Sequence, residues 1–373
     1  MHSITELSNI EGKRVLVRVD VNVPILDGAV TDAEAYRIHA ILPTIHYLLE
    51  RQAKIILISH LGRKGESLRP VAKYIENIFP CTFVPAVTGK TVTNAIDAME
   101  SGTIILLENL RTVAGEETND VGFAQVLASY ADIYINDAFA VSHRAHASVV
   151  GVPKLLPSYA GFLLEREIEE LNKVLHPVHP MHCVLSGAKP ETKLPLIEKL
   201  LTIGDVLYLG GVLANTFLKA RGYEVGTSVI GELSSIVHIQ DHIKIVLPVD
   251  VVVLRADKTV ATVTVRDVLK TDQIVDVGFE SIKNWHNNLK DAKTIVANGL
   301  LGWDGGGFVT GSKELIQALV PLEAYTILGG GDSVSLVRYY GFEDAFSFLS
   351  TGGGAMLEFI ASGGTLPGIT ALG

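Results

Sequence analysis

The feature that most constrains the fold of this chain is a repeated alternation of short β-branched runs with segments long enough for a helix. The series begins RVLVRVDV (14–21), EAYRIHAILPTIHYLLERQ (34–52) and KIILIS (54–59), and it resumes with HCVLSG at 182–187. Short apolar runs separated by amphipathic helical segments are typical of strands buried in a parallel sheet. The pattern predicts an α/β protein with two doubly wound, Rossmann-like parallel sheets.

The two series are separated by a proline-marked stretch and one long helical pattern. Pro153 and Pro157 precede SYAGFLLEREIEELNKVL, for which Ser158 is the expected N-cap. We interpret this pattern as a helix that connects the two halves. The predicted organisation is a first domain over 1–157, a connecting helix and hinge over 158–175, and a second domain over 176–357.

Charge and cysteine content narrow the classes of function. The chain has 373 residues, and 31 lysines and arginines against 41 aspartates and glutamates give a net charge of −10. This balance argues against non-specific binding to nucleic acid or to an anionic membrane. Two cysteines are too few for a disulfide framework, and the first residues lack the apolar run of a signal peptide. We therefore expect a cytoplasmic protein with no nucleic-acid or membrane partner.

Arginine and glycine are distributed unevenly between the halves. Residues 1–157 contain eight of the 13 arginines, whereas residues 158–373 contain 26 of the 35 glycines. Arginine side chains bind small oxyanions through two parallel hydrogen bonds, and glycine-rich turns let backbone N–H groups approach the phosphates of a nucleotide. The first half is thus predicted to bind a small acid, and the second a nucleotide.

Polar side chains of the first half cluster at predicted strand ends. The segments are RVDVNVP (18–24), Arg37, SHLGR (59–63), ENLR (108–111) and HRAH (143–146). In an open α/β sheet, ligands bind outside the carboxyl ends of the strands, so these side chains are expected to converge. Any one of these arginines could be an ordinary surface charge. Together with an imidazole, they suit a ligand that carries both a phosphate and a carboxylate.

Glycine turns follow successive strands in the second half. SGAKPETK (186–193) opens a helix, and Lys189 and Lys193 are four residues apart on one helix face. Further glycine turns are LGG (209–211), NGLLG (298–302), LGGGDS (328–333) and TGGGA (351–355). A single glycine triplet is more often a tight turn than a phosphate cradle. Several of them, with two lysines and the acidic Asp332, predict a site for a nucleotide with Mg²⁺.

These segments resemble the phosphoglycerate kinase family from about Arg14 to Leu372. The motifs, in family order, are RVDVNVP, SHLGR, LLENLR, GEETND, NDAFAVSHRAHAS, AGFLLERE, GAK, TFLKA, LPVDVVV, ILGGGDS, STGGGAMLEF and LPGI. The resemblance implies a glycolytic transferase with reversible phosphoryl transfer from 1,3-bisphosphoglycerate to ADP, giving 3-phosphoglycerate and ATP, with Mg²⁺ as cofactor. It also implies that the C-terminal tail, about 358–373, packs on the first domain. We further expect a monomer and a hinge closure.

The resemblance also implies site residues. Those expected to contact phosphoglycerate are Asp20, Asn22, Arg37, His60, Arg63, Arg111 and Arg144. Those expected to contact the nucleotide are Lys189, Lys193, Gly210, Gly211, Asn298, Asp304, Gly330, Gly331, Asp332 and Ser333, with Asp332 holding the metal. Catalysis is assigned to Arg37, Lys189, Gly352, Gly353 and Gly354. The carboxylate acceptor is already ionised at pH 7, so orientation and charge neutralisation suffice and no general base is needed.

The nucleotide half departs from the family pattern in several places. Ser186 stands where a glycine is usual, and Thr192 stands where an aspartate is usual. In GLLGWDGGGF (299–308) we expect Asp304 to replace a ribose-binding glutamate that is one methylene longer. Residues 254–276 are shortened or divergent, so adenine-pocket residues cannot be carried over. Weaker ribose contacts predict that GTP supports turnover within about tenfold of ATP.

Other interpretations have less support in the residues. A nicotinamide-dependent oxidoreductase would also use doubly wound domains, but it needs a strand–GxGxxG–helix unit, which the sequence lacks. A relative that binds ligands without catalysis would be expected to lose the charge-neutralising arginine, lysines and aspartate, which are all present. The segment HPVHPMHC (176–183) could bind zinc by residue type, but its prolines favour a solvated turn followed by a core strand.

Overall fold

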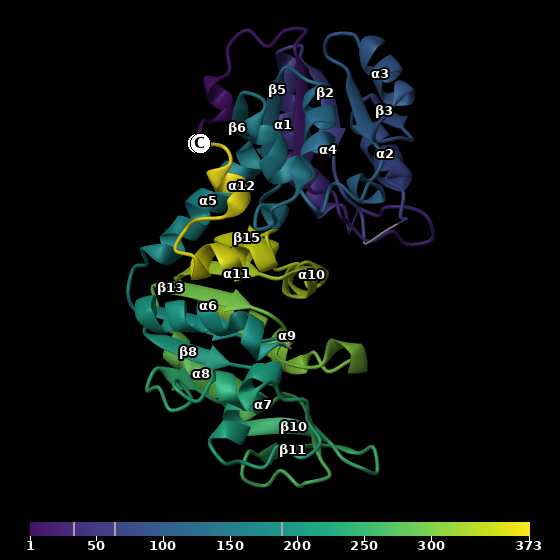
Figure 1. Cartoon of the computed structure of the whole chain (residues 1–373). Coiled ribbons are helices and arrows are strands. Elements are labelled where there is room, and N and C mark those ends of the chain that lie inside the picture. Colours follow the sequence, from purple (N-terminus) through teal and green to yellow (C-terminus); the bar gives the residue numbers. More distant parts are fainter. Residues whose placement is uncertain (33, 63–64, 188) are drawn as a thin grey trace. The chain divides into compact units, whose positions relative to one another are not determined.

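Two parallel sheets, one in each half of the chain, organise the fold. The structure is a computed structural model that describes residues 1–32, 34–62, 65–187 and 189–373. Within these residues the chain divides into two compact units, the first formed by 1–169 with 365–373 and the second by 170–364. Each unit contains a six-stranded sheet in which all neighbouring strands are parallel (Figure 1). The predicted α/β class with two parallel sheets is confirmed.

The first sheet grows in both directions from its first strand. Its order is β3-β4-β2-β1-β5-β6. The strands are β1 (Arg14–Val19), β2 (Lys54–Ile58), β3 (Cys81–Val84), β4 (Ile104–Leu107), β5 (Ile133–Asp137) and β6 (Ser158–Ala160). The chain adds β2 on one side of β1 and later adds β5 on the other side. Doubly wound folds bind ligands at such a reversal, beyond the carboxyl ends of the strands.

Helices bury this sheet. Val15 and Val17 of β1 lie in one hydrophobic cluster with α1 (Tyr36–Glu50) and α2 (Arg69–Glu76). Leu16 points to the opposite face because side chains alternate along a strand, and it is also fully buried. Because both faces of the sheet are buried, the sequences of its strands are nearly continuous apolar runs. The other helices of this unit are α3 (Lys90–Asp97), α4 (Val121–Ala128) and α12 (Pro367–Thr370).

The helix expected to begin near Ser158 starts later. Residues Ser158–Ala160 instead form β6, which pairs in parallel with β5, and α5 spans Phe162–Leu175. Asp137 caps this helix, because one of its carboxylate oxygens accepts hydrogen bonds from the N–H groups of Leu163 (2.9 Å) and Leu164 (3.2 Å). Residues 158–160 therefore form a strand that pairs with β5 at the sheet edge, although their sequence pattern also fits a helix. The boundary between the two units lies inside α5, after Glu169.

The last residues of the chain belong to the first unit. The N–H of Gly368, in α12, donates to the carbonyl of Ser142 at 2.8 Å. A Cβ at Gly368 would lie 2.7 Å from a methyl carbon of Val149, so only glycine permits this close approach. The tail, Thr365–Gly373, thus packs beside the segment that follows β5.

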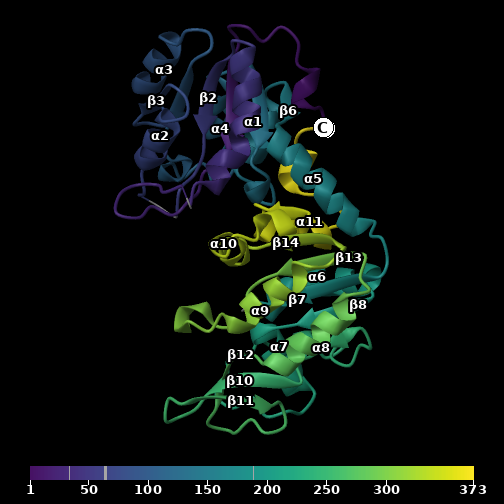
Figure 2. The same cartoon turned by 180° about the vertical axis from the view of Figure 1, so that it is seen from behind.

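The second sheet is also doubly wound, but its strand order differs from that of the first. Its order is β15-β14-β13-β7-β8-β9, so the direction reverses between β7 and β13. The strands are β7 (Met181–Leu185), β8 (Val206–Leu209), β9 (Ile245–Val246), β13 (Thr294–Asn298), β14 (Tyr325–Gly329) and β15 (Phe348–Ser350). The helices are α6 (Pro190–Ile203), α7 (Gly211–Ala220), α8 (Phe279–Leu289), α9 (Thr310–Leu319), α10 (Gly331–Tyr339) and α11 (Gly354–Ala361) (Figure 2). Apolar residues of β7, β13 and β14 form one core with α8 and α9.

A small antiparallel sheet was not predicted from the sequence. It has the order β11-β10-β12, with β10 (Asp250–Leu254), β11 (Val260–Thr264) and β12 (Gln273–Val277). The run IVLPVDVVVL (245–254) is divided around Pro248 into β9 and β10. Val251 and Val253 of β10 pack with Leu218 near the end of α7. The divergent segment 254–276 therefore forms most of a small layer that packs against α7.

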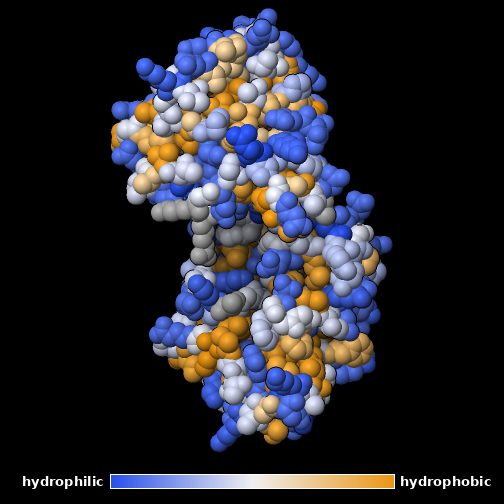
Figure 3. Space-filling view, turned by 90° about the vertical axis from the view of Figure 1, so that its right-hand side faces the viewer, coloured by the Kyte–Doolittle hydropathy of each residue, from blue (hydrophilic) through white to orange (hydrophobic). Residues whose placement is uncertain are grey.

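The surface is mixed in character. Figure 3 shows hydrophilic residues interspersed with hydrophobic ones over one face of each unit. None of the described helices is long and apolar enough to cross a membrane.

Candidate active site

The carboxyl ends of β1 and β2 carry a buried polar cluster in the first unit. Arg37, on α1, forms an ion pair with Asp20, which is buried just after β1. A terminal nitrogen of Arg18 lies 3.2 Å from His60 Nδ1, and both side chains are buried. Asn22 follows in the same loop, and its Oδ1 accepts a hydrogen bond from the N–H of Gly62 at 2.9 Å. The structure thus brings together four of the predicted residues with Arg18.

The charges of this cluster follow from its burial and its arginines. Burial alone would raise the pKa of Asp20, but the guanidinium of Arg37, with that of Arg18, holds it below its ordinary value. Burial lowers the pKa of His60 to about 3, and nearby arginines act in the same direction. His60 is therefore a neutral imidazole at pH 7, and the guanidinium groups carry the positive charge of the site.

Two further arginines add to this positive charge. Arg111 is buried, and its Nη1 donates to the carbonyl of Gly62. Its Nε is buried, makes no hydrogen bond to the described residues and lies 3.5 Å from a carboxylate oxygen of Glu117. Burial, followed by the charge of Arg144, lowers the pKa of Arg111. Arg144 Nε lies 3.2 Å from the ring of His143. Arginines that repel one another, one with an unused donor, form a site that an anion would stabilise.

A network behind this cluster was missed in the sequence. Arg18 Nε donates to Ser148 Oγ at 3.0 Å, and that hydroxyl donates to a carboxylate oxygen of Glu116 at 2.6 Å. The N–H of Ser148 donates to the other carboxylate oxygen at 3.0 Å. All three side chains are buried, so Glu116 and Ser148 hold Arg18 against His60. The motifs GEETND and HRAHAS contain two of these residues, but no spacing rule connects them across the sequence.

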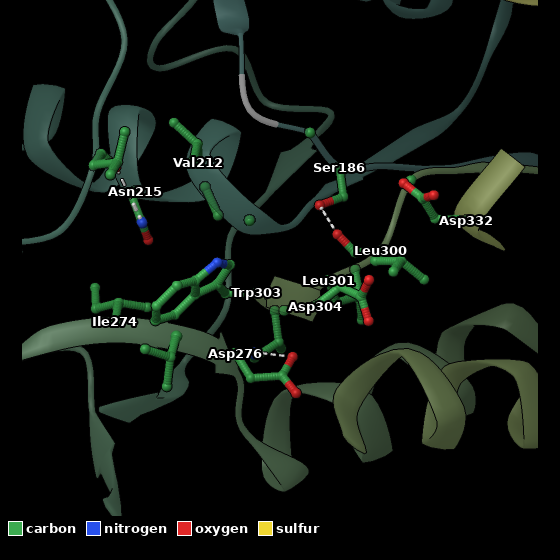
Figure 4. A pocket seen from close by; sticks show the side chains of 18 of the residues that line it. Ser186, Val212, Asn215, Ile274, Asp276, Leu300, Leu301, Trp303, Asp304 and Asp332 are labelled. Atoms are coloured by element: carbon green, nitrogen blue, oxygen red, sulfur yellow. Dashed lines mark hydrogen bonds between the residues drawn. The ribbon is translucent and has the colours of Figure 1, made fainter. Parts of the chain in front are cut away.

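The second unit has a cavity at the reversal between β7 and β13. Its volume is about 740 Å³. It is lined by the segments that follow β7 and β13, by the first turns of α7 and α10, and by β12 (Figure 4). Predicted residues along its wall are Lys193, Gly211, Asn298, Asp304, Gly330, Gly331, Asp332 and Ser333. The structure therefore brings most of the predicted nucleotide residues to one cavity.

Two glycines let backbone segments meet at the floor of this cavity. Gly299 has φ +90°, and a Cβ there would lie 2.5 Å from the carbonyl oxygen of Ser186. Gly211 has φ +58°, and a Cβ there would lie 2.6 Å from the hydroxyl of Ser186. That hydroxyl donates to the carbonyl of Leu300, which gives a structural reason for the departure at 186. The loops after β7 and β13 are thus joined directly.

Buried donors line this cavity, and two of them have no partner among the described residues. Lys193 Nζ donates to the carbonyl of Ser186 and lies 3.2 Å from Asn298 Oδ1. Burial lowers the pKa of Lys193 to about 8. The amide nitrogen of Asn298 and the hydroxyl of Ser333 are buried and make no hydrogen bond to the described residues. Such groups are rarely left unpaired unless a ligand or water supplies a partner. They fit the phosphates of a nucleotide.

One carboxylate on the cavity wall suits a hard metal ion. Asp332 is exposed in the first turn of α10, next to the unpaired Ser333. Mg²⁺ typically binds to one or two carboxylates together with substrate phosphates. Within the described part of the chain, no group of three or more His, Cys, Asp or Glu side chains is placed to hold a metal. The residues present therefore fit a Mg²⁺ that is held mainly by the nucleotide, with Asp332 as the protein ligand.

Several predicted residues lie elsewhere or outside the description. Lys189 is exposed at the N-cap of α6 and does not line the cavity, and neither do Gly210 and the 352–354 turn before α11. Gly210 instead packs against Leu301 and Ser186. The Thr192 hydroxyl donates to the carbonyl of Lys189 at 2.9 Å within the first turn of α6.

Arg63 lies outside the described residues. The segment HPVHPMHC forms no metal cluster among the described residues, because His179 pairs with Asp205 at 2.6 Å and Cys183 is buried.

Comparisons with known proteins match one family over nearly the whole chain. A sequence model described as phosphoglycerate kinase matches residues 4–363. The phosphoglycerate kinase of Pseudothermotoga lettingae is 44% identical over 389 residues, covering 98% of this chain and 96% of the relative. That of Moorella thermoacetica is 44% identical over 387 residues, covering 98% and 97%.

Solved structures give the same result. The phosphoglycerate kinase from Pyrococcus horikoshii superposes with a TM-score of 0.89 at 31% identity, covering 100% of this chain and 98% of the other. The enzyme from Coxiella burnetii gives a TM-score of 0.83 at 35% identity, covering 99% and 98%.

Proposed function

The chain belongs to the phosphoglycerate kinase family, glycolytic phosphotransferases with a carboxyl group as acceptor, and from this premise we propose how its units share the reaction. The first unit would bind 3-phosphoglycerate or 1,3-bisphosphoglycerate, and the second would bind ATP or ADP with Mg²⁺. The observation that carries this proposal is that two different groups of polar side chains and glycine turns lie at the winding reversals of the two sheets. One is a buried arginine cluster, and the other is a glycine-lined cavity with unpaired donors.

The arginine cluster suits a molecule with a phosphate at one end and a carboxyl at the other. Arg111 and Arg144, together with Arg63, would bind the 3-phosphate, because two parallel hydrogen bonds from a guanidinium match phosphate oxygens. Arg37, held by Asp20, would face the reacting carboxyl. The neutral His60 would donate one hydrogen bond without adding charge.

The cavity suits a nucleotide whose phosphates lie toward Asn298, Ser333 and Lys193. When bound, Mg²⁺ would neutralise phosphate charge, and Asp332 would hold it to the protein. Asp304 would accept hydrogen bonds from the ribose, since its carboxylate lies on the cavity wall. Lys189 and the N–H groups of the 352–354 turn are proposed to stabilise the transferring phosphoryl group.

Phosphoryl transfer needs little covalent chemistry from the protein. The acceptor carboxylate is ionised, so no side chain has to remove a proton. The protein has to orient two anions in line and to offset the charge that moves between them. Because the two ligands would bind on different units, we propose that a hinge movement around 158–175 brings them together and excludes water. One chain would supply both half-sites, so we propose a monomer, which sedimentation can test.

A coupled assay tests the function. The full-length protein is incubated with 3-phosphoglycerate, ATP and Mg²⁺, and the 1,3-bisphosphoglycerate formed is detected by a reducing enzyme. We expect product formation that stops when a chelator removes Mg²⁺ and resumes when Mg²⁺ is added back. Folded protein that forms no product at saturating substrates would contradict the proposed activity. Unchanged turnover in the presence of the chelator would contradict the metal requirement alone.

A further inference from the structure

The two tryptophans of the chain have opposite environments. Trp285 of α8 is 2% exposed and belongs to the core of the second unit. Trp303 is 50% exposed and lines the cavity at the reversal between β7 and β13. Figure 4 shows its indole ring projecting into the cavity beside Ile274. A large apolar ring that is half exposed inside a binding cavity has surface available for a ligand.

The loop around Trp303 holds the ring in one place. The N–H of Trp303 donates to the carbonyl of Val275 at 2.8 Å, which ties the residue to β12. A Cβ at Gly305 would lie 2.9 Å from the indole Nε1, and one at Gly306 would lie 2.6 Å from Cε3. The glycine pair therefore packs directly along the indole. The ring of Phe308 lies nearly parallel to it, at 23° with centroids 6.3 Å apart. The indole is thus a supported surface before any ligand binds.

The opposite wall of the cavity is formed by α7. Val212 and Asn215 lie three residues apart on this helix and line the cavity across from Trp303 (Figure 4). The amide nitrogen of Asn215 donates to the carbonyl of Val229 at 3.3 Å, which fixes the side chain in place. Another part of the same cavity is lined by Asn298 and Ser333, whose donors have no partner among the described residues, and by Asp332, the proposed metal ligand. One part is therefore aromatic and apolar, and the other is suited to phosphates.

We propose that Trp303 is the base-stacking residue of this chain, and that it selects purine nucleotides by ring area. The inference deepens the proposed function and rests on it for the identity of the ligand as a nucleotide. Stacking depends on the overlap of flat rings and tolerates different exocyclic groups. Adenine and guanine nucleotides should therefore bind similarly, as the weak ribose contacts of Asp304 also predict. Pyrimidine nucleotides, which have one ring, should bind less tightly.

Tryptophan fluorescence tests the contact directly. ADP stacked on Trp303 should quench the emission of the full-length protein, whereas inorganic tripolyphosphate, which has no base, should leave it unchanged. In Trp303→Phe the remaining Trp285 is buried in the core, so ADP should no longer quench. Quenching by ADP that persists unchanged in Trp303→Phe would place the base elsewhere and overturn the inference.

Calorimetry measures how much the contact with Trp303 contributes to ADP affinity. Trp303→Ala should weaken ADP binding about five- to 150-fold, the range that corresponds to the loss of one aromatic stacking partner. Trp303→Phe should stay within about threefold of the parent protein, because a smaller aromatic ring remains. The preference for ADP over CDP should shrink in Trp303→Ala. Phe279→Ala, which removes an exposed aromatic ring that does not line the cavity, is the matched control and should leave ADP affinity unchanged.

Tripolyphosphate separates a role in stacking from a role in folding the loop. Its affinity should be the same in the parent protein and in Trp303→Ala. An equal loss for ADP and tripolyphosphate, or ADP affinity unchanged in Trp303→Ala, would overturn the inference. The coupled assay with 3-phosphoglycerate decides the proposed function separately. ADP binding that depends on Trp303 in a protein without kinase activity would uphold the stacking role and reject the function.

Discussion

Both units contain a doubly wound parallel sheet, but their candidate anion sites are built from different groups. In the first unit the site consists of charged side chains that already pair with one another, such as Arg37 with Asp20 and Arg18 with His60. In the second unit the backbone approaches the cavity at glycines, and the buried donors of Asn298 and Ser333 make no hydrogen bond to the described residues. On the proposed function, the topology sets where a ligand would bind, and the residues at the reversal set which ligand would bind.

The difference has an energetic basis. A small acid offers few atoms, so tight binding requires strong charged contacts that are oriented in advance. Holding several guanidiniums together is unfavourable without a partner, and Asp20 and Glu116 offset part of that cost. A nucleotide offers a base, a ribose and phosphates, so it can be bound by many weaker contacts with the backbone and an aromatic ring.

The largest expected effect comes from removing the charge that is proposed to face the reacting carboxyl. Arg37→Ala should lower kcat about 10²- to 10³-fold, because a preorganised charge would be lost from the transition state. It also leaves Asp20 buried without its partner, at a cost of about 3–5 kcal/mol in stability. The double variant Arg37→Ala with Asp20→Asn should recover stability in a thermal melt but not kcat. Recovery of both would show that Arg37 is structural.

The second effect concerns the network behind the arginine cluster. Ser148→Ala should raise the KM for 3-phosphoglycerate about tenfold and lower stability by about 2 kcal/mol, because Arg18 Nε and the Glu116 carboxylate lose their shared partner. The KM for ATP should not change. Ser129→Ala, at an exposed hydroxyl after α4, is the control. Equal changes in both KM values would indicate a general loss of structure.

The third effect concerns the close approach of two backbone segments in the nucleotide cavity of the second unit. Gly299→Ala should raise the KM for ATP about tenfold or more, because its Cβ would collide with the backbone of Ser186. The control is Gly222→Ala, where φ is +85° but no atom lies within 4 Å of the added Cβ. Both substitutions strain the backbone by about 1–2 kcal/mol, but only the first should affect nucleotide binding. A shift in the KM for 3-phosphoglycerate would contradict the separation of the sites.

The fourth effect is a difference in pH dependence. Burial lowers the pKa of Lys193 to about 8, so its side chain is protonated below that pH and becomes neutral above it. ADP affinity should therefore fall as the pH rises from 8 to 9.5, by up to about tenfold per unit. Affinity for 3-phosphoglycerate should stay level, because guanidinium groups keep their charge. Calorimetry across this range should show a flat ADP profile for Lys193→Met. A sloping profile in that variant would assign the titration to another group.

The smallest effect concerns buried carboxyls that cap helices. Burial raises the pKa of Asp137, at α5, and of Asp276, at α9, to about 6 in each case. A raised pKa means that the folded state binds the proton more tightly, so this contribution favours folding at low pH and is lost as the pH rises through 6. Asp137→Asn keeps the accepting oxygen and should raise stability at pH 7 by about 1 kcal/mol. A loss of stability in denaturant unfolding at that pH would show that the charge itself is needed.

The sequence predicted the parallel sheets, and most of the residues that it singled out are brought together at the sheet reversals, because both depend on local patterns. Apolar runs define buried strands, and polar residues or glycines placed after them must meet at the carboxyl edge. The Glu116 network could not be predicted, because three residues far apart in sequence meet only through tertiary packing. The strand at 158–160 was missed because its residues fit the helical pattern, and pairing with β5 decided the outcome. The role proposed for Trp303 depends on the path of its loop, which spacing does not reveal.

The central claim is that the two substrates bind to separate units, and hydrogen exchange of the full chain tests it most directly. Amide exchange is followed by mass spectrometry with no ligand, with 3-phosphoglycerate alone and with ADP and Mg²⁺ alone. We predict that 3-phosphoglycerate slows exchange in peptides over 18–37 and 139–148, and that ADP slows it over 186–193 and 298–306. Protection of the same peptides by both ligands, or protection by each ligand in the opposite unit, would contradict the account.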